Sequence, residues 1–195
     1  CEEANVRYTV HRDRNIALQE LVNESLFADL LVVQKNETLT RFTEGVPTRF
    51  IADLLEKAAC PILLVSNNYH RVGKNIFLYD GSPSSLYALK QFSCLFPGKP
   101  GFLEVITVRG EKQTQLLPAA RLFKEWVKDH YTAVQYNVLR GDSEEEIVAE
   151  IKRQEKHPLI ILGAYDRGRV SRWLHPSIAN RIMSEFDCPL FIAHK

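Results

Sequence analysis

The sequence CPILLV begins at Cys60, and a related sequence, CPLFIA, begins at Cys188, 128 positions later. Further matches precede both copies in the same order: VRYTV at 6–10 with VQYNV at 134–138, DLLVV at 29–33 with PLIIL at 158–162, and VPT at 46–48 with HPS at 175–177. Several matches in one order indicate an internal repeat, and a repeat decides the architecture before any local pattern does. The chain is therefore expected to hold two related units.

The composition and charge argue against several classes of protein. The chain has 195 residues, 45% of them hydrophobic and 25% charged, with a net charge of +1. That charge offers no electrostatic attraction to nucleic acid or to an anionic membrane, and no apolar run approaches the ~20 residues of a membrane span. Cys60 and Cys188 each precede a proline and a strand, without metal-binding spacing, so we expect reduced, buried thiols in a cytoplasmic protein.

The second unit, residues 75–195, alternates strand and helix patterns. Short apolar runs at 75–79, 102–108, 134–138, 159–162 and 190–193 predict strands, and helical periodicity lies between them. This alternation predicts a parallel, doubly wound α/β sheet with helices on both faces. The runs at 76–79 and 159–162 are continuously apolar, so we expect them to be neighbouring central strands.

The first unit, residues 1–66, matches only the later part of the second unit. Its patterns predict strands at 6–10, 30–33 and 62–65, with helices around 16–25 and 48–57. Residues 67–74 are polar and predict a linker. The segment that would carry the first two strands has no counterpart here, so we expect further residues upstream to supply it in the parent protein. Without them, residues 6–10 would have to rearrange or find another partner.

Two places in the second unit follow strand ends, where ligands bind in open α/β sheets. Asp80 follows the first strand, in a D-G-S-P context that also produces an ordinary turn before a helix. The stretch 162–177 places a glycine, three arginines including Arg167, and a helix start in the layout of an anion cradle. The acidic run at 144–146 is interpreted as charge that complements a helix dipole. No catalytic or metal-binding arrangement is present in the sequence.

These residues resemble the universal stress protein family. The resemblance covers 75–195 and rests on D-G-S-P at Asp80, R-G-D-S-E-E-E-I from Arg140, the loop 162–177 and the closing CPLFIAHK. Residues 1–66 resemble the last half of a second such domain, and tandem copies are known in the family. The resemblance implies a five-stranded parallel sheet of order 3-2-1-4-5. In many members it also implies an ATP site, with Asp80 at the adenosine and a G-x2-G-x9-G-[S/T] loop at the ribose and phosphates.

The loop departs from that pattern. Gly163 and Ser177 match its first and last positions, but Asp166 and Pro176 replace the other two glycines. Pro176 has no N–H to donate. Two like charges at about 5 Å cost on the order of 3 kcal/mol at an effective dielectric constant near 20, so Asp166 opposes a phosphate, and Arg167 offsets part of this cost. The first unit lacks the first two glycines and has Pro47 before Thr48, so nucleotide binding is not expected there.

The sequence therefore predicts a cytoplasmic universal stress protein of regulatory or binding type, not an enzyme. Its degenerate nucleotide site would comprise Asp80, Gly163, Arg167 and Ser177, with no required cofactor, no metal and at most weak binding of ATP. The alternative is an ATP-binding member that hydrolyses ATP slowly. We expect the last strands of the two units to associate, either within one chain or between two chains, because a bare apolar edge promotes aggregation.

Overall fold

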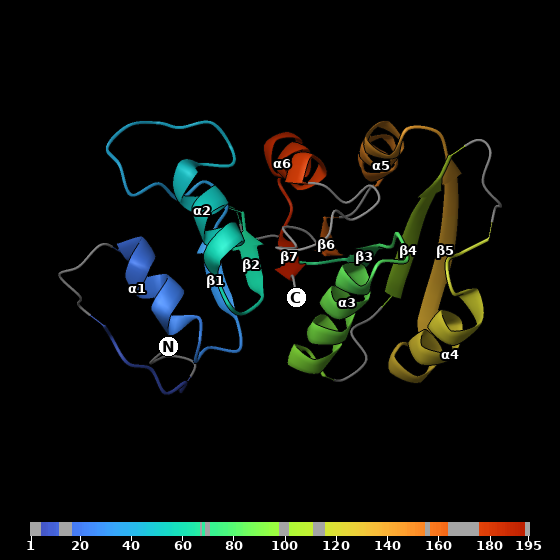
Figure 1. The fold of residues 1–195 in the computed structure, drawn as a ribbon, viewed down its shortest axis with the longest axis horizontal. Coiled ribbons are helices and arrows are strands. Elements are labelled where there is room, and N and C mark those ends of the chain that lie inside the picture. Colours follow the sequence, from blue (N-terminus) through green and yellow to red (C-terminus); the bar gives the residue numbers. More distant parts are fainter. Residues whose placement is uncertain are drawn as a thin grey trace.

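A computed structural model describes residues 5–11, 17–66, 68, 71–97, 102–110, 116–154, 157–163 and 176–193. Its strands form one seven-stranded sheet of order β1-β2-β7-β6-β3-β4-β5 (Figure 1). The first unit supplies β1 (Leu31–Gln34) and β2 (Ile62–Val65). The second unit supplies β3 (Lys74–Leu78), β4 (Phe102–Arg109), β5 (Ala133–Arg140), β6 (Pro158–Gly163) and β7 (Leu190–Ala193). The predicted α/β class is confirmed.

The second unit is a parallel sheet in which β3 and β6 are central neighbours. Numbered along the chain, its five strands have the order 3-2-1-4-5. Ile76, Phe77 and Leu78 of β3 are fully buried, and every residue of β6 is buried. The buried stretch Ile76–Leu78 and the whole of β6 are apolar because helices cover both of their faces.

In the described parts of the chain, six helices cover the sheet in two layers. They are α1 (Ala17–Glu24), α2 (Arg49–Lys57), α3 (Pro83–Leu95), α4 (Ala120–His130), α5 (Ser143–Lys152) and α6 (Pro176–Glu185). One hydrophobic cluster packs α2, α5 and α6 on one face, with side chains of α1 against it. A second cluster, rich in aromatic residues, packs α3 and α4 on the other face (Figure 1). The two-layer covering is that of a doubly wound fold.

The two units join edge to edge within the chain. β2 pairs antiparallel with β7, whereas every other strand pair is parallel. Beside this pair, Lys35 donates a hydrogen bond to the Phe186 carbonyl at 2.7 Å and lies 3.1 Å from an Asp187 carboxylate oxygen. Of the two arrangements considered from the sequence, the structure has the one within a chain. Because β2 and β7 are now paired on both edges, pairing between chains through them would require these bonds to break.

The predicted strand at 6–10 is wrong. This segment has no strand structure, and Val6, Tyr8 and Val10 are each more than half exposed. A strand needs hydrogen-bonding neighbours, and the strand that would lie beside this one is not among the described residues. β1 lies at the edge of the described sheet, with β2 as its partner there.

Candidate functional site

The sheet reverses its strand order between β3 and β6, because the chain passes from β3 outward through β4 and returns through β6 toward β7. Ligands of open α/β sheets bind at the carboxyl ends of the strands at such a point. Asp80 follows β3, and Gly163 ends β6. The fold therefore brings these two predicted residues to the same end of adjacent strands.

Asp80 has a structural role at this point. It is 5% exposed, and its Oδ1 accepts a hydrogen bond from the Ser82 N–H at 2.8 Å. Ser82 is in turn the N-cap of α3, and its Oγ accepts from the Ser85 N–H at 3.1 Å. Asp80 thus orders the turn that starts α3, which is the turn role considered from the sequence.

The glycine between them also serves the turn. Gly81 has a φ of +85°, and a Cβ at this position would lie 2.3 Å from the Pro118 Cβ. Pro118 belongs to the segment before α4, and its carbonyl accepts a hydrogen bond from the Tyr79 hydroxyl at 2.9 Å. Only glycine fits this left-handed, crowded position, so the D-G-S-P sequence is explained by local structure.

Tyr79, the residue before this turn, is packed into the protein core. Its ring stacks on Phe123 with centroids 4.1 Å apart, and its carbonyl accepts a hydrogen bond from the Thr107 hydroxyl at 2.8 Å. Burial, and secondarily the Asp80 charge, raises the pKa of Tyr79 to about 12. The residue before Asp80 is therefore held in the aromatic cluster that packs α3 and α4.

Gly163 is a contact between β6 and α3. A Cβ there would lie 2.4 Å from both the Ser84 carbonyl carbon and its oxygen. The first turn of α3 thus rests directly on the end of β6, and any side chain at position 163 would collide with backbone. The sequence pattern assigned this glycine to phosphate approach, but packing alone accounts for it.

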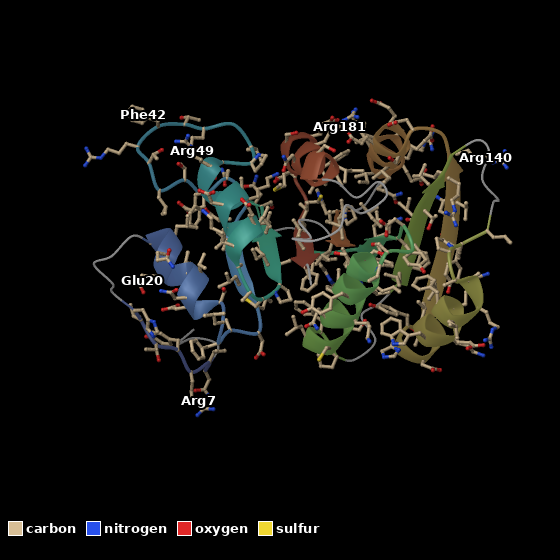
Figure 2. The ribbon with its side chains drawn as sticks, viewed as in Figure 1. Arg7, Glu20, Phe42, Arg49, Arg140 and Arg181 are labelled. Atoms are coloured by element: carbon tan, nitrogen blue, oxygen red, sulfur yellow. The ribbon has the colours of Figure 1, made fainter. Side chains whose placement is uncertain are left out.

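Ser177 lies in the first turn of α6 and contacts α5. Its hydroxyl donates a hydrogen bond to the Glu144 carboxylate. Farther along α6 lies Arg181 (Figure 2). Its Nη1 lies 2.9 Å from Glu145 Oε1, and Lys152 lies 2.8 Å from Glu185. Residue numbers rise together on both helices, so α5 and α6 run parallel with their N-termini side by side.

Ion pairs connect these two helices. The hydrogen bonds that Arg181 donates to Glu145 and Glu185 raise the pKa of Arg181 above its ordinary value. Hydrogen bonds from Lys152 and Arg181 lower the pKa of Glu185. All of these groups are at the surface, so their contribution to stability is small.

The equivalent position in the first unit is fully occupied by its own chain. Thr48, which matches Ser177, is 1% exposed and is the N-cap of α2. Its hydroxyl donates to the Glu37 carbonyl at 2.5 Å and accepts from the Ile51 N–H at 3.2 Å. Glu44 Oε2 accepts from the Arg49 N–H at 2.8 Å. These bonds engage the Thr48 hydroxyl and the N–H groups of Arg49 and Ile51 within the chain.

The structure places three of the four predicted site residues. Asp80 and Gly163 both contact the start of α3, and Ser177 contacts α5. Arg167 and Asp166 lie outside the described residues. Within the described ranges, no group of three metal-ligating side chains is present, and no helix there is long and apolar enough to cross a membrane. Sequence reasoning missed Glu144 as a site residue, because its contact joins segments 33 positions apart.

The fold and the strand-end site define a doubly wound α/β protein with a ligand-binding topology. Residues 101–194 match the model of the universal stress protein family. The later part of the second unit is therefore similar to universal stress proteins. No match to a curated protein sequence was found.

Solved structures share the fold across both units. A universal stress protein from Archaeoglobus fulgidus is 15% identical with a TM-score of 0.60; the match covers 91% of this chain and 65% of that protein. A putative universal stress protein from Pseudomonas aeruginosa is 11% identical with a TM-score of 0.56; the match covers 93% of this chain and 69% of that protein. The chain thus spans just under two thirds of the Archaeoglobus protein.

Proposed function

We propose that this chain is a universal stress protein of regulatory or binding type, whose second unit has only a weak, degenerate site for ATP or another phosphate compound. The proposal rests on one observation: the side chains that would bind the ligand are already hydrogen-bonded to other groups of the protein. The Asp80 carboxylate accepts the Ser82 N–H, and the Ser177 hydroxyl donates to Glu144. A ligand would have to displace these bonds, and each displaced polar group lowers its net affinity.

The compartment and the chemistry belong to the same proposal. Cys60 and Cys188 are free and buried, and Cys94 is free and exposed, a usage typical of the reducing cytoplasm. The Asp80 carboxylate accepts the Ser82 N–H and orders the turn before α3, and the non-enzymatic role that we propose is consistent with this structural use.

The alternative is an ATP-binding protein that hydrolyses ATP slowly. What favours it is the placement of Asp80 and Gly163 at the carboxyl ends of the two central strands, with Ser177 in the first turn of α6. In that case the loop with Arg167 would have to replace the missing glycines.

A thermal-shift titration with ATP, ADP and AMP, each with Mg²⁺, separates the two. For binding near 1 mM, a 1 mM ligand stabilises by roughly 0.4 kcal/mol, a shift of about 1–2 °C for a chain of this size. Binding a thousandfold tighter would stabilise by about 4 kcal/mol and raise the melting temperature by roughly 8–16 °C. The larger shift, together with release of inorganic phosphate, would refute the proposal in favour of the alternative.

A further inference from the structure

At two equivalent helix N-termini, a carboxylate side chain from elsewhere in the chain contacts the first turn of the helix. In the repeat, α2 of the first unit corresponds to α6 of the second, and Thr48 corresponds to Ser177. Glu44 reaches the first turn of α2, and Glu144 reaches the first turn of α6. A helix N-terminus attracts anions through its free N–H groups and its dipole. Glu44 accepts such an N–H at α2, and Glu144 binds the Ser177 hydroxyl at the start of α6.

In the first unit this carboxylate is held from both sides. Glu44 Oε2 accepts the Arg49 N–H, and Oε1 accepts from Thr38 Oγ1 at 3.0 Å and from Thr40 Oγ1 at 3.2 Å. The Arg49 N–H, the largest cause, lowers the pKa of Glu44. The first unit therefore shows that this chain can satisfy such a helix start with its own acid.

In the second unit the carboxylate comes from the neighbouring helix α5, whose own N-terminus is capped by a different residue. The N-cap of α5 is Asp142, whose Oδ1 accepts the N–H groups of Glu144 and Glu145 at 3.0 and 3.1 Å. With α5 capped in this way, the Glu144 side chain extends to Ser177 instead. Because α5 and α6 are parallel, one carboxylate lies between two positive helix ends.

We infer that Glu144 is a built-in competitor for anions at the start of α6 and sets the low affinity of the second unit for phosphate compounds. The inference rests on the proposed function, which gives the second unit a weak phosphate site. A phosphate that approaches Ser177 meets a carboxylate already bound to its hydroxyl. The ligand must displace Glu144, and it is repelled by that charge until it does.

The chain offers a matched control for this inference. Glu145 is the next residue of the same helix turn and carries the same charge, but its carboxylate binds Arg181 at 2.9 Å rather than Ser177. Removing either acid changes the net charge equally. Only the removal of Glu144 frees the Ser177 hydroxyl.

The experiment measures dissociation constants by calorimetry for the unmodified protein and for Glu144→Gln, Glu144→Ala and Glu145→Gln. The probes are ATP with Mg²⁺ and inorganic tripolyphosphate, which lacks the adenosine. Both Glu144 variants should bind each probe roughly tenfold tighter than the unmodified protein, as expected for loss of a partly screened like charge. Glu145→Gln should stay within about twofold, because exposed charges at a distance are screened.

The outcomes distinguish this inference from the proposed function. Sub-micromolar binding by the unmodified protein refutes the proposed function, and this inference with it. Weak binding that is unchanged in both Glu144 variants overturns this inference alone, as does an equal gain in Glu145→Gln. Because Glu144→Ala removes the side chain and Glu144→Gln keeps its shape, a folding defect in one variant leaves the other to decide.

Discussion

Leu63 lies directly opposite Phe191 in the antiparallel pair of β2 and β7, and the two residues occupy equivalent positions of the repeat, 128 apart. The flanking pairs are reciprocal: Ile62 with Ile192, and Leu64 with Leu190. Reciprocal contact between equivalent residues is the property of a twofold interface. The two units therefore meet as a pseudo-twofold pair, although the first unit shows only the later elements of the repeat.

The two sides of this junction should contribute unequally to the free energy of unfolding. Phe191 is fully buried and its ring lies 5.2 Å from that of Phe92 in an edge-on contact, whereas Leu63 is only partly buried. We expect Phe191→Ala to lower the free energy of unfolding by about 3–5 kcal/mol. Leu63→Ala should cost less, roughly 1–2 kcal/mol. Urea denaturation measures both, and equal losses would contradict the asymmetry.

A buried ion pair fixes the start of β3 to β4. Lys74 Nζ lies 2.6 Å from Glu104 Oε2, and the Glu104 side chain is 2% exposed. Lys74→Met should cost about 3 kcal/mol, because it leaves a buried carboxylate without its partner. The control Lys57→Met breaks an exposed pair with Asp53 and should cost no more than about 0.5 kcal/mol. Adding Glu104→Leu to Lys74→Met should restore most of the loss; a double variant as unstable as the single would refute this account.

The three described thiols should differ in reactivity. Burial raises the pKa of Cys188 to about 12 from an ordinary 9.0, and burial also raises that of Cys60. The thiolate is the reactive form, so at pH 8 iodoacetamide should modify the exposed Cys94 and spare Cys60 and Cys188 until the protein unfolds. Peptide mapping by mass spectrometry reads each site separately. Equal rates at Cys94 and Cys188 would show that the junction opens readily.

The same pKa shift predicts how stability depends on pH. The folded state keeps Cys188 protonated, whereas the unfolded thiol ionises near pH 9.0. The stabilisation is fully present below pH 9 and is lost as the pH rises toward about 12. The free energy of unfolding should therefore fall between pH 9 and 11, and it should fall less steeply in Cys188→Ala. Parallel pH curves for the two proteins would contradict this assignment.

Much of the fold could be predicted from the sequence because the repeat and the apolar runs are local signals. The apolar runs 76–79, at the end of β3, and 159–162, in β6, are unbroken, which places them at the centre of a covered sheet. The segment 6–10 has an equally good strand pattern, VRYTV, but a pattern supplies no hydrogen-bonding neighbour. Its strand depends on residues elsewhere in the fold, and no local signal reports whether they are present.

The candidate site was harder to predict than the fold. Asp80 and Gly163 were found from their positions after strands, but their neighbours Ser82 and Ser84 decide what they do. Glu144 was interpreted as dipole charge on its own helix. Its contact with Ser177 depends on α5 and α6 lying parallel, and that arrangement arises from the packing of the whole face.

Gly163 offers a direct test of packing against ligand binding. A Cβ at this position would meet the Ser84 carbonyl at 2.4 Å, a contact that neither the central strand β6 nor the first turn of α3 can relieve by a side-chain movement. We expect Gly163→Ala to lower the free energy of unfolding by about 1–3 kcal/mol, the usual cost of overpacking, with no nucleotide present. The control is Gly110→Ala, where nothing lies within 4 Å of the added Cβ, and its cost should stay within about 0.5 kcal/mol. Urea denaturation without ligand decides the matter. If Gly163→Ala is as stable as the unmodified protein and loses only its binding of ATP, then this glycine serves the phosphate and the packing explanation is wrong.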